Sequence, residues 1–172
     1  MWKALLFVLT VTPILGDGKF PTRAQALSRI FPDTIAKSHT VYLTKDELEQ
    51  AKKLAGDNTP SIVRYFSVYS GKTLMGFAIL DTHRVRSKRE SVLFGINNDG
   101  SLAGTTVLGF AEPRDFLPSP RWLKQFVGKR LNDELRLKKG IHGITGATLT
   151  SRAVTQAARR SLALMEVIRK RK

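Results

Sequence analysis

Hydroxyl side chains surround a glycine in residues 145–151, which read Thr-Gly-Ala-Thr-Leu-Thr-Ser. Residues 154–168 repeat apolar side chains at helical spacing, so this segment lies where a long helix should begin. The first N–H groups of a helix lack intrahelical acceptors, and the helix dipole places partial positive charge beside them. Two interpretations follow: a hydroxyl can cap the helix, or the segment can bind a phosphate group.

The preceding sequence predicts the elements that would hold this segment in place. Thr44 and Glu47 form a capping-box pattern before a helix that ends at Gly56, and residues 22–31 predict a shorter helix. Residues 40–43 are typical of extended chain. Four further segments predict strands, because tight-turn residues join them in pairs: residues 62–70 with 74–81, and residues 91–97 with 103–110.

Consecutive strands joined by tight turns are typical of an antiparallel sheet and not of βαβ units. We therefore expect an α+β fold, in which an antiparallel sheet of about four strands is flanked by helices. Residues 120–127 predict a helix that turns Trp122 and Val127 inward. A long C-terminal helix should run from Thr150 or Ser151 to about Arg169.

The chain is strongly basic and contains no cysteine. Its 172 residues carry a formal net charge of +15, and residues 136–172 hold ten Lys or Arg against one acidic residue, Glu166. Such a bias indicates an anionic binding partner: nucleic acid, an acidic membrane surface, a phosphate ligand or an acidic protein. The lack of cysteine excludes disulfides, thiolate nucleophiles and metal sites with cysteine ligands.

Residues 1–18 predict a secretory signal peptide. Lys3 precedes about thirteen mostly apolar residues, which are too few for a comfortable membrane span of about 20 residues. Gly16 or Gly18 is small enough to precede a cleavage site. The alternative is a segment retained as an anchor. We expect residues 19–172 to form a single domain in the periplasm or on the outer face of the cytoplasmic membrane.

Residues 144–151, which read Ile-Thr-Gly-Ala-Thr-Leu-Thr-Ser, resemble the covalent flavinylation motif of the FMN-binding domain family. That family includes the C subunit of sodium-pumping NADH:quinone reductase and the G subunit of the Rnf complex. Its motif runs Asp, two variable residues, Ser or Thr, then Gly-Ala-Thr, and residues 145–148 match it. His142 stands where the family usually has Asp; as an alternative, His142 is an ordinary exposed loop residue. The layout of residues 60–165 is similar to that of small exported members.

The resemblance implies that Thr148 carries FMN as a phosphoester, transferred from FAD by a separate flavin transferase. The N–H groups of Leu149, Thr150 and Ser151 would receive the phosphate. Arg152 would be a nearby cation or, equally, a solvated side chain on the helix. The expected cofactor-binding residues are therefore Thr148, Thr145, Gly146, Ala147, Leu149, Thr150, Ser151 and His142.

The resemblance also implies a function: an exported electron-transfer flavoprotein that shuttles electrons between membrane-associated redox partners. The resemblance thus favours an electron carrier over a stand-alone oxidoreductase. A second hypothesis is a flavin-dependent reductase of a small periplasmic acceptor. A third is a basic nucleic-acid-binding module. The export signal and the lack of a basic-aromatic strand face argue against the third hypothesis, so we expect no nucleic-acid partner.

Three other features allow two interpretations each. The basic residues 84–89 form either a solvated loop or a docking surface for an acidic redox partner or lipid head groups. Asp81 and His83 are an ordinary polar pair, or part of a catalytic or metal site whose third member is not evident. Glu112 and Trp122 flank a proline-rich loop and form a wall for the flavin, unless Trp122 packs in the core.

Overall fold

The computed structural model describes residues 20–132 and 134–171. The predicted signal peptide therefore lies outside the described residues. Five strands form one antiparallel sheet in the order β1-β2-β3-β4-β5. Their bounds are β1 Ile35–Tyr42, β2 Ile62–Ser70, β3 Thr73–Arg84, β4 Arg89–Asn97 and β5 Leu102–Phe110.

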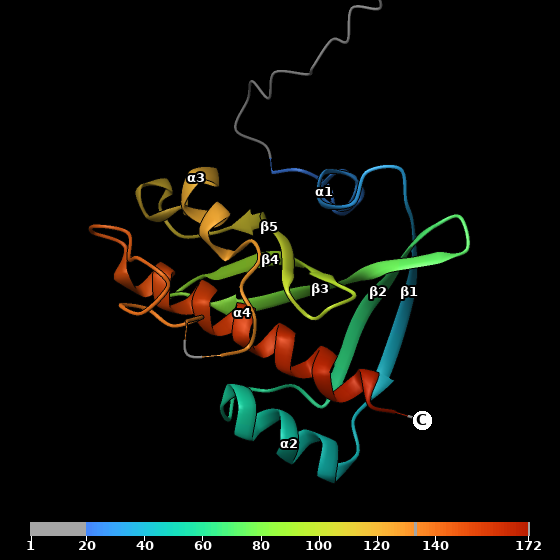
Figure 1. The fold of residues 1–172 in the computed structure, drawn as a ribbon. Coiled ribbons are helices and arrows are strands. Elements are labelled where there is room, and N and C mark those ends of the chain that lie inside the picture. Colours follow the sequence, from blue (N-terminus) through green and yellow to red (C-terminus); the bar gives the residue numbers. More distant parts are fainter. Residues whose placement is uncertain (1–19, 133, 172) are drawn as a thin grey trace, which may run out of the picture.

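Helices cover both faces of this sheet (Figure 1). The long helix α4 (Thr148–Arg169) packs against β3 and β4 on one face, and α1 (Arg23–Ile30) packs against β4 and β5 on the other. Helix α2 (Lys45–Ala55) lies beside α4. The short helices η1 (Arg114–Phe116), α3 (Pro120–Leu123) and η2 (Lys124–Phe126) follow β5. The α+β prediction, with flanking helices and a long C-terminal helix, is confirmed.

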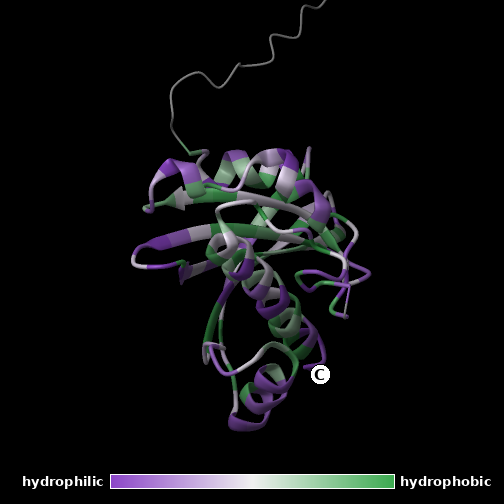
Figure 2. Cartoon of the chain, turned by 90° about the vertical axis from the view of Figure 1, so that its left-hand side faces the viewer, coloured by the Kyte–Doolittle hydropathy of each residue, from purple (hydrophilic) through white to green (hydrophobic). Residues whose placement is uncertain are grey.

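The sheet separates two hydrophobic clusters, because successive strand residues point to opposite faces. The larger cluster joins Phe94 and Ile96 to Val154, Ala158 and Leu162 of α4. The smaller cluster joins Phe66, Val68 and Leu93 to Leu27 of α1. Figure 2 shows hydrophobic and hydrophilic residues alternating along the helices, as expected where each helix buries only one face.

Glycines let α1 approach the sheet closely. A Cβ atom at Gly95 would lie 2.4 Å from Cγ2 of Ile30, and one at Gly104 would lie 3.0 Å from Cγ1 of the same residue. A Cβ atom at Gly95 would force Ile30 to move, and one at Gly104 would make a tight contact that displaces Ile30 slightly. The two glycines therefore leave the room that Ile30 of α1 occupies against β4 and β5.

Strands β2 and β3 pair only over part of their length. Their register begins at Tyr65 and Ile79, whereas β1 stays paired with β2 to Ile62 and β4 stays paired with β3 to Arg84. Residues 62–64 and 80–84 therefore have a strand partner on one side only. Figure 1 shows β1 and β2 turning away from β3 and β4 at this end of the sheet.

The structure corrects three details of the sequence-based expectation. The sheet has five strands and not about four. The additional strand is β1, which the sequence did not predict in full because most of its residues are exposed and it lacks the alternating pattern of a half-buried strand. Helix α4 begins at Thr148, two or three residues earlier than predicted. Val127 was expected to face inward, but its side chain is 54% exposed, because the helical segment ends at Phe126.

Within residues 20–132 and 134–171, no helix has both the length and the apolar character that crossing a membrane requires.

Candidate functional site

Helix α4 begins without a side-chain cap. Its N-cap residue is Ala147, and no side chain accepts a hydrogen bond at this position. The first N–H bonded within the helix is that of Ser151, which donates to the carbonyl of Ala147 at 3.0 Å. The N–H groups of Thr148, Leu149 and Thr150 are thus the donors left without intrahelical acceptors. The predicted donors were the N–H groups of Leu149, Thr150 and Ser151, so the observed set begins one residue earlier.

Ser151 supports the loop before the helix instead of capping it. Its hydroxyl accepts a hydrogen bond from the N–H of Ile144 at 2.8 Å and donates one to the carbonyl of Ala147 at 3.1 Å. The residue is fully buried. Gly146 adopts a φ of +77°, which glycine adopts without a steric penalty. Ser151 and Gly146 together turn the chain so that Thr148 enters the helix with its side chain exposed.

A pocket of about 300 Å³ opens beside Thr148 and the uncapped helix turn. We call it the threonine pocket. Of the predicted cofactor-binding residues, Gly146, Ala147, Thr148, Leu149 and Thr150 line it together. Its other walls come from segments far away in the sequence: Val85, Arg86, Glu112 and Phe116.

Three predicted cofactor-binding residues do not line the threonine pocket. Thr145 is exposed, and Ser151 is buried behind the first turn. His142 is exposed, but its backbone is held: the indole Nε1 of Trp122 donates to its carbonyl at 2.7 Å, and its N–H donates to Oε1 of Gln125 at 2.8 Å. Contacts from the sequence-distant segment 122–125 therefore fix the position of the loop before the motif.

Trp122 forms no wall of the threonine pocket. Its ring meets Phe126 edge-on, with 5.2 Å between ring centroids, and it packs against the larger hydrophobic cluster. The structure therefore favours the core interpretation of Trp122.

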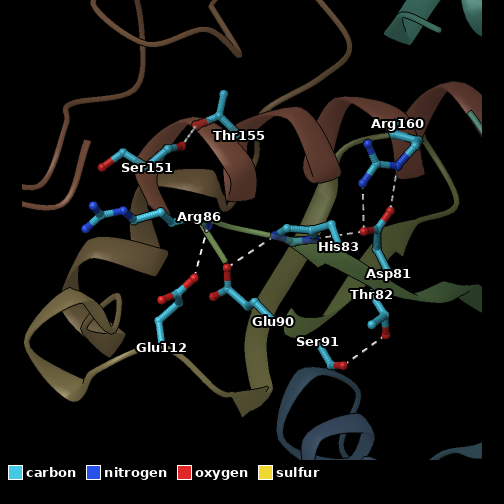
Figure 3. A network of polar contacts seen from close by, with 10 residues as sticks. All are labelled: Asp81, Thr82, His83, Arg86, Glu90, Ser91, Glu112, Ser151, Thr155 and Arg160. Carbon is cyan, nitrogen blue, oxygen red and sulfur yellow. Dashed lines mark hydrogen bonds and ion pairs between the residues drawn. The ribbon is translucent and has the colours of Figure 1, made fainter. Parts of the chain in front are cut away.

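Glu112 is the residue that shapes the wall opposite the helix. Its Oε1 atom accepts hydrogen bonds from the N–H groups of Arg86 at 3.1 Å, Ser87 at 2.6 Å and Lys88 at 2.7 Å. These backbone hydrogen bonds, first that of Lys88 and then those of Ser87 and Arg86, lower the pKa of Glu112. The basic loop predicted between two strands is thus folded around a carboxylate, as Figure 3 shows for Arg86.

A second, larger cleft of about 650 Å³ lies beside the threonine pocket. We call it the strand cleft, because it lies where β2 and β3 separate and α4 covers them. Val85 and Leu149 line both cavities, so the two are neighbours. Its remaining lining comes from residues 57–60, 62–64 and 79–84, and from Arg152, Ala153, Gln156, Arg160 and Leu164 of α4.

A buried polar network forms one wall of the strand cleft (Figure 3). Nδ1 of His83 lies 2.9 Å from Oδ1 of Asp81, and Nε2 lies 3.2 Å from Oε2 of Glu90. Arg160 contacts both oxygens of Asp81, with Nε and one Nη nitrogen each at 2.7 Å. The sequence singled out Asp81 and His83, but β-sheet register is what brings Glu90 opposite His83.

Burial and hydrogen bonds within this network shift the pKa values of its ionisable groups. Burial acts against the imidazolium, but hydrogen bonds to Asp81 and Glu90 outweigh it and raise the pKa of His83. Burial also opposes ionisation of Asp81, yet His83 and Arg160 lower its pKa. Burial raises the pKa of the fully buried Glu90. Within the part of the chain that the structure describes, no cluster of His, Asp or Glu side chains is arranged to hold a metal ion.

Comparison with known proteins bears on the segment that contains Thr148 and most of the residues that line the threonine pocket. Residues 87–163 match the family model of the FMN-binding domain. The G subunit of the Na⁺-translocating ferredoxin:NAD⁺ oxidoreductase complex of Acetobacterium woodii is 35% identical over an 89-residue alignment. That alignment covers 46% of this chain and 43% of the relative, so the chain spans less than half of the relative's length.

The fold also matches a solved structure. The crystal structure of Shewanella oneidensis NqrC superposes with a TM-score of 0.56 and 17% sequence identity, covering 91% of this chain and 92% of that chain. At this identity the likeness concerns the fold. The matched segment begins at Ser87, beside the carboxylate of Glu112, and includes Thr148 and most of α4. Residues 87–163 are therefore the part of this chain that resembles the FMN-binding domain family.

Proposed function

We propose that this chain is an exported electron-transfer flavoprotein that carries FMN as a phosphoester on Thr148. One observation carries the proposal: within the segment matched to the FMN-binding domain, an exposed threonine is the first residue of an uncapped helix and lines a pocket. A helix capped by its own side chain would already have used the donors that a phosphate needs.

The residues around Thr148 suit the phosphate end of FMN. Three backbone N–H groups, those of Thr148, Leu149 and Thr150, lack intrahelical acceptors at the positive end of a 22-residue helix. Arg86 adds a cation to the lining. A Cβ atom placed on Gly146 would meet nothing within 4 Å, so the turn leaves room for close approach of a ligand. When bound there, FMN would supply one- or two-electron redox chemistry through its isoalloxazine ring.

Attachment would need a separate flavin transferase. A threonine hydroxyl is a weak nucleophile, and a metal ion in the transferase would neutralise charge on the phosphates of FAD. In this step the Thr148 oxygen forms a bond to the FMN phosphorus, the phosphoanhydride bond of FAD breaks, AMP leaves, and the hydroxyl proton is released. The exposure of Thr148 makes its oxygen accessible to another protein, as this route requires.

Co-expression with a flavin transferase tests the attachment. We expect the denatured wild-type chain to keep its yellow colour and flavin fluorescence, the Thr148→Val protein to lose both, and the Thr148→Ser protein to keep some. Thr148→Ser is the matched control because it preserves a hydroxyl at the same atom position. A Thr148→Val chain that stays fluorescent after denaturation would sink the claim.

The proposed role is electron transfer between membrane-associated redox partners outside the cytoplasm. The relative in Acetobacterium woodii is a subunit of an oxidoreductase complex, which motivates a carrier role here. Export rests on the sequence of residues 1–18. Fractionation of cells that produce the full chain tests it. We expect a product outside the cytoplasm that has lost roughly its first 18 residues, and a full-length cytoplasmic product would contradict export.

A further inference from the structure

The β3–β4 hairpin ends in a loop, residues 84–89, that is held by its backbone and not by its charged side chains. The N–H of Val85 donates to the carbonyl of Lys88 at 3.1 Å, and Glu112 accepts the N–H groups of residues 86–88. We call this segment the basic loop, because four of its six residues are exposed cations: Arg84, Arg86, Lys88 and Arg89. Since backbone contacts close the loop, these side chains are left to meet solvent or a partner.

Two cations of the basic loop lie where they oppose folding. In the register of β3 and β4, Arg84 is directly opposite Arg89. Like charges that face each other across an antiparallel pair are destabilising. The side chains of Arg84, Lys88 and Arg89 make no hydrogen bond or ion pair with any residue that the structure describes. Folding therefore does not explain these cations, whereas binding to an anionic surface does.

The basic loop borders the threonine pocket. Val85 and Arg86 line that pocket. A neighbouring groove of about 550 Å³ is lined by residues 86–88, residues 111–113 and the half-buried Phe116. The loop therefore joins cations to an apolar side chain, and protein interfaces likewise combine a polar rim with an apolar centre. A protein seated on the basic loop would lie beside the pocket of the proposed attachment threonine.

We propose that the basic loop is the docking surface for a redox protein with an acidic face, which exchanges electrons with the FMN carried on Thr148. This inference rests on the proposed function. Encounters between redox proteins are small and are steered by complementary charge, which suits a short cationic loop beside a cofactor pocket. A lipid surface requires only charge, whereas the backbone of this loop is held in one arrangement by Glu112. The fixed arrangement favours a folded acidic partner.

Two triple variants with the same net charge test the inference. The loop variant removes three cations of the basic loop: Arg84→Gln, Lys88→Gln and Arg89→Gln. The control variant removes three exposed cations that lie on α2 and in the β2–β3 turn: Lys45→Gln, Lys53→Gln and Lys72→Gln. A difference between the two variants reports where the charge lies and not how much charge is lost.

Urea denaturation shows whether the loop cations serve folding. The loop variant should be at least as stable as the wild type, because the repulsion between positions 84 and 89 is removed. A loop variant that is less stable than both the wild type and the control variant would assign these cations to folding and overturn the inference.

Binding of cytochrome b5, an acidic redox protein, tests the docking surface without any flavin. At low salt the loop variant should bind about tenfold more weakly than the wild type and the control variant at most about twofold more weakly, and salt should weaken wild-type binding. Equal affinities of the two variants, or no binding by the wild type, would overturn the inference. An intact mass without FMN would contradict the proposed function, and the difference in affinity would still support an acidic docking partner.

Electron transfer to the same probe tests the redox role. The flavinylated chain is reduced with dithionite and mixed with ferric cytochrome b5, so that each haem iron takes up one electron while the flavin is reoxidised and releases its protons to water. At low salt the initial rate for the loop variant should be about tenfold below that for the control variant. Equal rates for the two variants would overturn the inference.

Two further measurements separate the other possible occupants of the basic loop. Vesicles of phosphatidylcholine with and without phosphatidylglycerol test a lipid surface, and FMN loading read by intact mass tests the flavin transferase. We expect the two variants to bind anionic vesicles equally and to load FMN equally. A loop variant that alone lost vesicle binding, or alone lost FMN loading, would assign the surface to the membrane or to the transferase and overturn the inference.

Discussion

The hydroxyl of Ser151 accepts a hydrogen bond from the N–H of Ile144 at 2.8 Å, and this contact fixes the loop that delivers Thr148 to the start of α4. The same hydroxyl donates to the carbonyl of Ala147, so one buried side chain spans the whole turn. The arrangement explains why a segment rich in Ser and Thr leaves its helix uncapped. The hydroxyl best placed to bind backbone is used for the loop, and the helix donors stay available.

Ser151→Ala should therefore destabilise the fold and reduce flavin attachment. The substitution leaves the N–H of Ile144 without its acceptor, which costs about 1–3 kcal/mol for a buried group. Urea denaturation of the unflavinylated chain would measure the loss in unfolding free energy. Thr145→Ala is the control, because this exposed side chain should change stability by less than about 0.5 kcal/mol. Equal stabilities for the two variants would contradict the role given to Ser151.

Glu112→Gln should loosen the loop that forms the far wall of the threonine pocket. The amide of Gln is uncharged, so its oxygen is a weaker acceptor for the three N–H groups of Arg86, Ser87 and Lys88. We expect faster amide hydrogen exchange at these three residues and unchanged exchange in α2. Glu49→Gln, which alters an exposed carboxylate on α2, is the control. Unchanged exchange at residues 86–88 would contradict the anchoring role.

His83 should make the stability of the chain depend on pH above neutrality. His83 contacts two carboxylates, Asp81 on β3 and Glu90 on β4, and Arg160 on α4 pairs with Asp81. The pKa of His83 is raised in the folded protein. A raised pKa means that the stabilisation is complete below the ordinary value of about 6.5 and is lost as pH rises through the folded value. Unfolding free energy should therefore fall as pH rises from about 6.5.

His83→Gln should flatten that dependence, measured by urea denaturation at a series of pH values. His142→Gln removes an exposed histidine and should leave the slope as in the wild type. Parallel curves for the wild type and His83→Gln would contradict the account of the network.

Glu47 and Arg171 should couple α2 to the end of α4. Nε of Arg171 donates to Oε1 of Glu47 at 2.7 Å, and Oε2 of Glu47 accepts the N–H of Thr44 in the capping box of α2. The hydrogen bond with Arg171 and then that with Thr44 lower the pKa of Glu47 to about 2, so the pair is ionised at neutral pH. A double-mutant cycle with Glu47→Ala and Arg171→Ala should give a coupling of about 0.2–1 kcal/mol that weakens with salt. A coupling of zero at low salt would contradict it.

Local patterns in the sequence were enough to predict most elements. The capping box of Thr44 and Glu47 brings together side chains only three residues apart, and the turn at residues 98–100 lies between two regular strands. The apolar stripe of α4 depends on helix geometry alone. The flavinylation motif predicted five residues that the structure gathers at one pocket.

Long-range contacts carry what the sequence could not predict. Glu112 binds N–H groups 24 to 26 residues earlier in the chain, so nothing in its neighbourhood marks it as the centre of a loop. Glu90 meets His83 only through the register of β3 and β4. Strand β1 pairs with β2 at the edge of the sheet while most of its side chains are exposed, so it has no burial pattern to detect.

The most direct test of the central claim is the mass of one tryptic peptide. Cleavage after Lys139 and Arg152 releases residues 140–152, which contain Thr145, Thr148, Thr150 and Ser151. After co-expression with a flavin transferase, this peptide should gain the mass of FMN less one water, and fragmentation should place the added mass on Thr148. An unmodified peptide, or an adduct on one of the other three hydroxyls, would contradict the account.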